Sequence, residues 1–177
     1  MTDRFLPKLD DSEIKIAGTV SESIVDGPGV RYVIFTQGCP HRCHGCHNPH
    51  TQPFEGGKTI KIKQLYDEIK SNPLIEGVTL SGGEPFCQCA PLSVLAKRLN
   101  AEGVSVMAYS GYTFEQLCEK AENDKATRNL LAYTNILVDG PFILEKRDLM
   151  LKYRGSSNQR MLDITCYPNS PLIKEID

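Results

Sequence analysis

The chain has 177 residues and a formal net charge of -2, with 20 basic and 22 acidic side chains. This length suffices for one domain with a hydrophobic core, and the balanced charge, without a basic tract, argues against a nucleic-acid partner or a membrane surface. Apolar runs are too short to cross a bilayer, and the charged first residues do not resemble a secretion signal. We therefore expect a cytoplasmic protein with no nucleic-acid or membrane partner.

The amino-acid pattern alternates between strands and helices. Runs of β-branched and aromatic residues between turn signals predict strands near 14–20 and at 30–35, 78–80, 104–109, 136–138 and 160–164. Apolar residues at helical spacing predict helices at 60–71 and 91–102, after residue 113 and near 124–132. Thr113 and Gln116 have the spacing of a capping box, which marks the start of the third helix.

This strand–helix–strand order predicts an α/β fold with a mostly parallel sheet and right-handed crossovers. Four loops each follow a predicted strand: the cysteine-rich loop, Ser81–Pro85, Ser110–Tyr112 and Asp139–Pro141. Because the carboxyl ends of parallel strands share one edge, we expect these loops to meet where such folds build active sites. We expect a single domain over residues 1–177, with a core at about 15–165.

Three of the seven cysteines and all four histidines lie within one short loop. Cys39, Cys43 and Cys46 have the spacing C-x3-C-x2-C. Three thiolates bind three irons of a 4Fe–4S cluster and leave the fourth iron open to a substrate. The alternative is zinc held by the three cysteines with His47 or His50, although C-x2-C pairs are more usual for zinc. The residues favour the iron–sulfur cluster.

The other four cysteines are scattered along the chain, at Cys87, Cys89, Cys118 and Cys166. In a chain without a secretion signal, they are expected to be reduced and not to form a disulfide framework. Their number would suit a second metal site. Isolated thiols are the preferred interpretation, because Cys118 lies on the apolar face of a predicted helix.

Several motifs resemble a known superfamily. The C-x3-C-x2-C spacing is similar to that of the radical S-adenosylmethionine (radical SAM) enzymes. Asp26-Gly-Pro-Gly-Val-Arg31 and His47-Asn48 resemble the members that activate glycyl-radical enzymes. The resemblance to activases of anaerobic ribonucleotide reductases covers about residues 15–160 and includes Leu80-Ser-Gly-Gly-Glu-Pro85, Asn135-Ile-Leu-Val-Asp-Gly140 and Arg154-Gly-Ser-Ser-Asn-Gln159.

The resemblance implies a short radical SAM core, an incomplete β/α barrel of about four to five strands with an N-terminal strand extension. It implies an oxidoreductase with one 4Fe–4S cluster, on which S-adenosylmethionine (SAM) is reductively cleaved to a 5′-deoxyadenosyl radical. That radical takes a hydrogen atom from a glycine of the partner, the glycyl-radical subunit of anaerobic ribonucleoside-triphosphate reductase. A flavodoxin or ferredoxin is the implied electron donor. The alternatives are activation of a formate-lyase-type or other glycyl-radical enzyme, a small-molecule radical SAM reaction, and, remotely, a zinc-binding interaction module.

The resemblance also implies which residues form the site. The metal ligands are Cys39, Cys43 and Cys46, and no side chain acts as a catalytic acid or base. Glu84 and exposed carbonyls near it are expected to accept hydrogen bonds from the ammonium group of SAM. Gly45 stands where relatives carry an aromatic residue, which leaves adenine to the Gly45 backbone and the His47 ring. The expected SAM contacts are Gly45, Cys46, His47, Gly82, Gly83, Glu84, Ser110 and Asp139.

Two further polar features have open interpretations. Arg31, within a predicted strand, either faces the SAM carboxylate or the partner's backbone, or points into solvent. The polar segment 154–160 is either a surface loop or part of the site or of partner docking.

Overall fold

The computed structural model describes residues 6–169 and 173–176. The strands are β1 Glu13–Ser23, β2 Arg31–Thr36, β3 Lys58–Lys61, β4 Gly77–Gly82, β5 Ser105–Tyr109, β6 Ile136–Asp139, β7 Arg160–Asp163 and β8 Lys174–Glu175. The helices are α1 Ile62–Ser71, α2 Cys89–Ala101, α3 Phe114–Asn123 and α4 Lys125–Ala132, with 3-10 turns η2 Pro49–Thr51, η3 Pro85–Cys87 and η4 Leu144–Lys146. The predicted helices and strands are confirmed to within a few residues.

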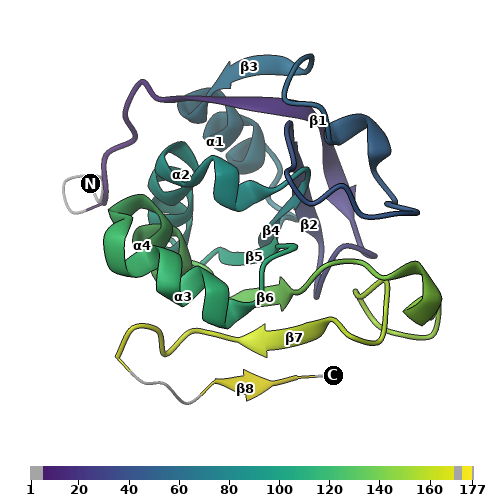
Figure 1. The fold of residues 1–177 in the computed structure, drawn as a ribbon. Coiled ribbons are helices and arrows are strands. Elements are labelled where there is room, and N and C mark those ends of the chain that lie inside the picture. Colours follow the sequence, from purple (N-terminus) through teal and green to yellow (C-terminus); the bar gives the residue numbers. More distant parts are fainter. Residues whose placement is uncertain (1–5, 170–172, 177) are drawn as a thin grey trace.

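All the strands form one mixed sheet in the order β3-β1-β2-β4-β5-β6-β7-β8 (Figure 1). The neighbours β2, β4, β5 and β6 pair in parallel, so the centre of the sheet is parallel, but four of the seven described strand pairings are antiparallel and the sheet as a whole is mixed rather than mostly parallel as expected. The strands outside that core, β1 and β3 on one flank and β7 and β8 on the other, pair antiparallel. Within the described residues the sheet has eight strands, where four to five with an extension were expected, and β3 and β8 are its edge strands.

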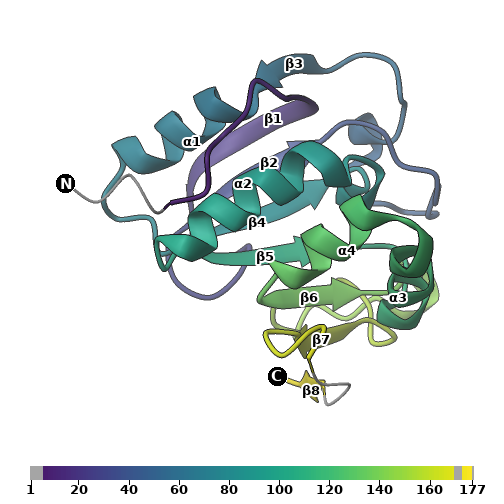
Figure 2. The same ribbon diagram turned by 90° about the vertical axis from the view of Figure 1, so that its left-hand side faces the viewer.

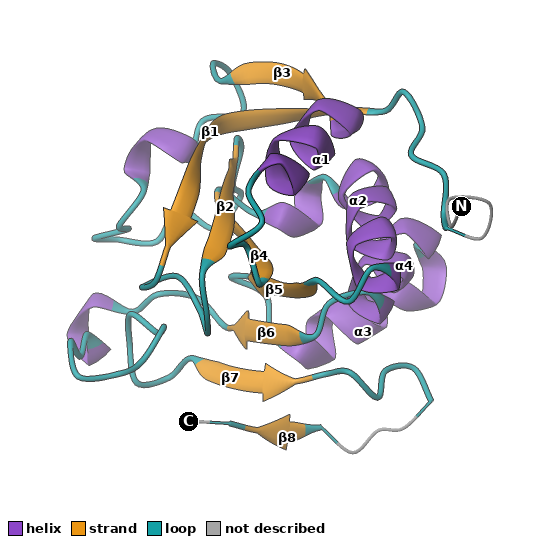
Figure 3. Ribbon diagram, turned by 180° about the vertical axis from the view of Figure 1, so that it is seen from behind, coloured by secondary structure: helices purple, strands orange, loops and turns teal. Residues whose placement is uncertain are grey.

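The four helices lie on one side of the sheet, and the long loops that follow β2 and β6 lie on the other (Figures 2 and 3). Side chains alternate between the two faces of a strand. In β5, Val106 and Ala108 belong to the main core under the helices, whereas Met107 packs with Val138 and Met161 in a smaller cluster on the opposite face. The sheet therefore has an apolar layer on each face, a large one under the helices and a smaller one on the side of the long loops.

Helix α3 begins where the sequence predicts. Thr113 Oγ1 accepts a hydrogen bond from Gln116 N at 3.3 Å, and Gln116 Oε1 accepts one from Thr113 N at 2.9 Å, so the capping box is confirmed. Asp139, the last residue of β6, adds a third bond by accepting from Phe114 N at 2.7 Å. The helix is therefore fixed to the end of the neighbouring strand.

The four loops singled out in the sequence follow β2, β4, β5 and β6, which are parallel neighbours. They consequently leave the sheet at the carboxyl ends of these parallel strands, as expected. None of the helices in the described part of the chain combines the length and the apolar composition that crossing a bilayer requires.

Candidate cofactor site

A cavity of about 490 Å³ lies at the carboxyl ends of the parallel strands β2, β4, β5 and β6. Its volume is within the range of small-molecule and cofactor sites. All four strand-end loops contribute to its wall, together with the segments 25–26 and 151–159. Its lining residues include the following members of the motifs described above: Cys39, Cys43, Cys46, His47, Gly82, Gly83, Ser110, Gly111 and Gly140.

The cysteine loop is held against the sheet by backbone hydrogen bonds. Gly38 N donates to Thr51 O at 2.8 Å, which closes the loop on itself. Glu84 N donates to Gly38 O at 2.8 Å, which joins the loop to the turn after β4. A Cβ at Gly83 would lie 2.3 Å from Gly38 O, so glycine is required there by the closeness of the two loops.

The three cysteines line the cavity and are partly buried. Burial raises the pKa of the Cys39 thiol to about 11. Cys46 Sγ accepts a long hydrogen bond from Asn48 N at 3.4 Å, the kind of amide contact that tunes iron–sulfur clusters. Three thiols with an amide donor on an accessible wall fit the ligand set of such a cluster. In the described residues, His, Cys, Asp and Glu side chains form no group of three arranged to hold a single metal ion.

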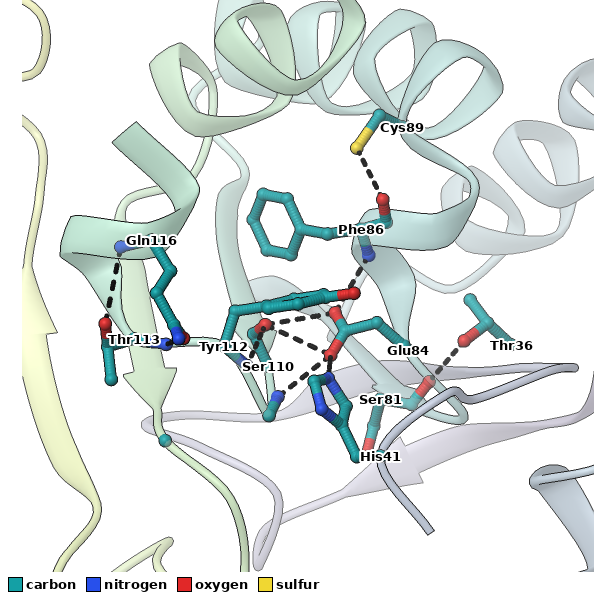
Figure 4. A network of polar contacts seen from close by, with 12 residues as sticks. Thr36, His41, Ser81, Glu84, Phe86, Cys89, Ser110, Tyr112, Thr113 and Gln116 are labelled. Atoms are coloured by element: carbon teal, nitrogen blue, oxygen red, sulfur yellow. Dashed lines mark hydrogen bonds and ion pairs between the residues drawn. The ribbon is translucent and has the colours of Figure 1, made fainter. Parts of the chain in front are cut away.

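Glu84 lies at the centre of a polar network and is fully buried, with 0% of its surface exposed (Figure 4). Its Oε2 lies 2.8 Å from His41 Nε2 and accepts from Gly111 N at 2.8 Å. Its Oε1 accepts from Phe86 N at 3.0 Å. Ser110 Oγ is within 3.1 Å of both carboxylate oxygens. The carboxylate therefore connects three of the four loops.

Three of the expected SAM contacts lie away from the cavity wall. Glu84 faces the network just described. Asp139 is 1% exposed and bonds to Phe114 N and to Arg160, so its carboxylate links α3 and β7. Gly45 has a φ of +73°, and a side chain there would press on Leu144. The other expected contacts, Cys46, His47, Gly82, Gly83 and Ser110, line the cavity.

Arg31 corrects both sequence interpretations, because it faces neither the cavity nor solvent. It is 1% exposed, and its guanidinium donates to the hydroxyls of Thr79 and Ser105 and to the carbonyls of Pro28, Val78 and Ser105. Burial lowers its pKa to about 10. The missing side chain of Gly77 leaves room for the guanidinium, since a Cβ there would lie 2.3 Å from Arg31 Nη1.

The segment 154–160 contributes to the cavity wall through Arg154, Gly155 and Gln159. Gln159 fixes the segment: its Oε1 accepts from Gly155 N at 2.9 Å, and its Nε2 donates to Gly140 O at 3.1 Å. The segment is thus joined to the loop after β6, and it is part of the cavity rather than a detached surface loop.

Several aromatic residues of the cavity were missed by sequence reasoning. The Phe142 ring lies 4.7 Å from that of His47, and both line the cavity. Tyr109 Oη donates to Tyr153 O at 2.8 Å, and burial raises the pKa of Tyr109 well above its usual range. Tyr109 ends a predicted strand beside a glycine-bearing loop, and Phe142 directly follows the Asp139–Pro141 loop, so the position of each residue next to a strand-end loop was a usable signal.

The remaining cysteines differ in exposure. Cys87 and Cys166 are exposed, Cys118 is partly buried against the main core, and Cys89 is buried with its Sγ donating to Phe86 O at 3.1 Å. Their status as isolated thiols stays a prediction.

Comparison with known proteins gives three kinds of match. Residues 25–162 match the family described as 4Fe-4S single cluster domain. The anaerobic ribonucleoside-triphosphate reductase-activating protein of Haemophilus influenzae is 33% identical over 147 residues, which cover 77% of this chain and 89% of that protein. The pyruvate formate-lyase-activating enzyme of Staphylococcus epidermidis is 46% identical over 90 residues, covering 48% of this chain and 36% of that protein. The crystal structure of QueE from Escherichia coli aligns with a TM-score of 0.46 and 21% identity, over 57% of this chain and 54% of that one.

Proposed function

Because this chain belongs to the family of anaerobic ribonucleoside-triphosphate reductase-activating proteins, we propose that it is a radical SAM activase that installs a glycyl radical on that reductase. The observation that carries the proposal is the cavity at the edge of the parallel strands. It brings the three cysteines of the C-x3-C-x2-C loop together with the glycine loops after β4, β5 and β6. The whole chain acts as one radical SAM domain, and its curved sheet corresponds to an incomplete barrel.

In this proposal Cys39, Cys43 and Cys46 hold a single 4Fe–4S cluster through three thiolates. The peptide groups of Gly82 and Gly83 line the cavity without side chains, so a ligand can approach their backbone closely. His47 and Phe142 give an aromatic wall for adenine. When bound, the cluster and SAM supply one electron and a 5′-deoxyadenosyl radical, which abstracts hydrogen from a glycine α-carbon. The protein's own residues position these groups and keep water from them.

Exposed apolar side chains support a polypeptide substrate. Val25 and Leu151 line the cavity, and their chain neighbours Ile24, Leu149 and Met150 are 75%, 80% and 90% exposed. Such a patch is typical of protein contact sites. The glycyl-radical subunit of the reductase would cover it during hydrogen transfer. A flavodoxin or ferredoxin is proposed as the electron donor.

The test is anaerobic incubation of the reconstituted protein with the reductase, SAM and a reductant, followed by electron paramagnetic resonance. We expect the doublet of a glycyl radical on the reductase. Cys43→Ala should abolish both SAM cleavage and the radical, whereas Cys166→Ala, which removes an exposed thiol elsewhere, should keep both. Full SAM cleavage by Cys43→Ala, or a protein that holds zinc and no iron, would disprove the proposal.

A second candidate is activation of a formate-lyase-type enzyme. It is favoured by the 46% identity to the Staphylococcus epidermidis activating enzyme, although this covers only 36% of that protein. Offering the reductase and a pyruvate formate-lyase in parallel separates the two, because only the true partner acquires the doublet signal.

A further inference from the structure

We propose that Glu84 is a positioning residue that fixes the cysteine loop through His41, rather than the acceptor of the SAM ammonium group. This inference rests on the proposed function and deepens it. The Gly-Gly-Glu-Pro turn then has two separate roles: Gly82 and Gly83 offer their backbone to the cavity, and the next residue holds the loop that carries the cluster ligands.

The hydrogen-bond capacity of the carboxylate is the first argument. A carboxylate has about four acceptor positions. Oε1 receives Phe86 N and Ser110 Oγ at 3.0 Å each. Oε2 receives His41 Nε2 and Gly111 N at 2.8 Å each. An ammonium group would have to displace one of these donors and would have to reach a side chain that is 0% exposed.

The second argument is the place of His41. It lies between Cys39 and Cys43, so its ring moves with the backbone that carries two of the three thiols. The ring packs against Tyr112 with centroids 4.4 Å apart. It also fills the space beside Gly111, where a Cβ would lie 2.3 Å from His41 Cδ2.

The consequence is a mechanical connection between the sheet and the cluster ligands. Glu84 follows β4, and Ser110 and Gly111 follow β5, so the carboxylate is held by two parallel neighbours of the central sheet. Through its bond to Glu84, His41 extends that support to the cysteine loop (Figure 4). Partners that orient a ligand loop in this way typically change metal affinity when they are removed.

The experiment compares Glu84→Gln, His41→Ala and the double variant after anaerobic reconstitution. In Glu84→Gln, either orientation of the amide places its NH2 against Phe86 N or Gly111 N. Because both of these groups are donors, the substitution replaces a hydrogen bond with a contact between two donors. We expect both single variants to lose iron to a chelator about tenfold faster than the parent. We also expect a shared change in the electron paramagnetic resonance spectrum of the reduced cluster without SAM.

The double variant should resemble the single variants, because both remove the same connection. His41→Gln, which returns an N–H donor, should restore slow iron release. Glu102→Gln is the matched control: its carboxylate bonds to Tyr66 and Lys70 far from the cavity, so its effects report general destabilisation alone. It should leave the rate of iron release and the spectrum unchanged.

A different result would overturn the proposal. If Glu84→Gln weakens SAM binding about tenfold while iron release and the SAM-free spectrum match the parent, Glu84 is a SAM ligand. Normal iron release by His41→Ala would also refute the connection, and this variant decides the matter if Glu84→Gln does not fold. A parent protein that takes up no cluster would instead refute the proposed function.

Discussion

Gly83 is required by the closeness of two loops, not by its backbone angle. An added Cβ would lie 2.3 Å from Gly38 O, a backbone atom that cannot move aside alone. Gly83→Ala should therefore lower the free energy of unfolding by about 2 kcal/mol or more, measured by urea denaturation of the apoprotein. Gly18→Ala, with nothing within 4 Å of the new carbon, should change it by less than about 0.5 kcal/mol. Equal effects of the two substitutions would contradict the close approach.

Arg31 is a buried cation that acts as a structural crosslink. Its five hydrogen bonds reach the loop before β2 and the strands β4 and β5. Arg31→Met would remove all five of these hydrogen bonds from a buried site, so we expect a loss of about 2–4 kcal/mol in the free energy of unfolding. Arg147→Met, at an exposed arginine, serves as the control and should cost little. A similar midpoint of denaturation for both would show that the guanidinium contributes no net stability.

Arg31 and Glu84 show which contacts of single residues could not be predicted from the sequence. The cysteine spacing predicted which thiols share a cavity wall, because the three lie on one loop. The partners of Arg31 and Glu84 are distant in the sequence: Thr79 and Ser105 lie on other strands, 48 and 74 positions from Arg31, and His41 lies on the cysteine loop, 43 positions from Glu84. Whether a charged side chain is buried and satisfied depends on which strands pair, and neighbouring residues carry no signal of that.

At the scale of elements, α1 and α2 are joined by a carboxylate at the end of α2. Glu102 accepts from Tyr66 Oη at 2.7 Å, pairs with Lys70 at 3.0 Å and bonds to Arg98. Burial acts to raise the pKa of Glu102, but these hydrogen bonds outweigh it and lower the pKa to about 2. The network therefore joins two helices on the face of the sheet opposite the cavity.

This network predicts a pH dependence. The folded pKa of Glu102 is below its ordinary value of 4.5, so the network stabilises the fold fully above about pH 4.5 and less as the pH falls towards 2. At pH 7, Glu102→Gln should lower the free energy of unfolding by about 1–2 kcal/mol, since the pair is partly accessible to solvent. The difference between variant and parent should shrink between pH 5 and pH 3 in urea titrations. A constant difference across that range would exclude this linkage.

The elements differ in how far the sequence specifies them. The capping box of α3 is local, because both of its hydrogen bonds join Thr113 and Gln116, three positions apart, and it was predicted correctly. Strands β3 and β8 were missed. In β3 only Ile60 is buried, and both residues of β8 are exposed, so neither gives an alternating apolar pattern. They are strands because the edges of β1 and β7 offer hydrogen bonds.

At the scale of the whole molecule, the exposed apolar side chains of Ile24, Leu149 and Met150 lie next to cavity segments, where the proposed partner protein would contact them. Leu149→Asp should leave SAM cleavage in the absence of the reductase unchanged. It should raise the KM for the reductase about tenfold, or about 1.4 kcal/mol, because an apolar contact is replaced by a charge. The measurement is the yield of glycyl radical against reductase concentration.

Leu74→Asp is the matched control for this substitution. Leu74 is 64% exposed and lies on the turn before β4, at the N-terminal end of the parallel strands, whereas Leu149 lies on the long segment that follows β6 at their C-terminal end. It should leave the KM for the reductase unchanged. If both variants activate the reductase normally, the partner does not dock on the residues around Leu149.

The sheet order has a consequence for the life of a newly made chain. Synthesis proceeds from the N-terminus, so the cysteine loop leaves the ribosome before β4, β5 and β6, and long before the segment 151–159 that completes the cavity wall. The three thiols are therefore made before most of the cavity wall that shelters them. Under the proposed function, loading with iron and sulfide would be a maturation step of the finished chain, and the thiols would be most open to oxidation between their synthesis and that step.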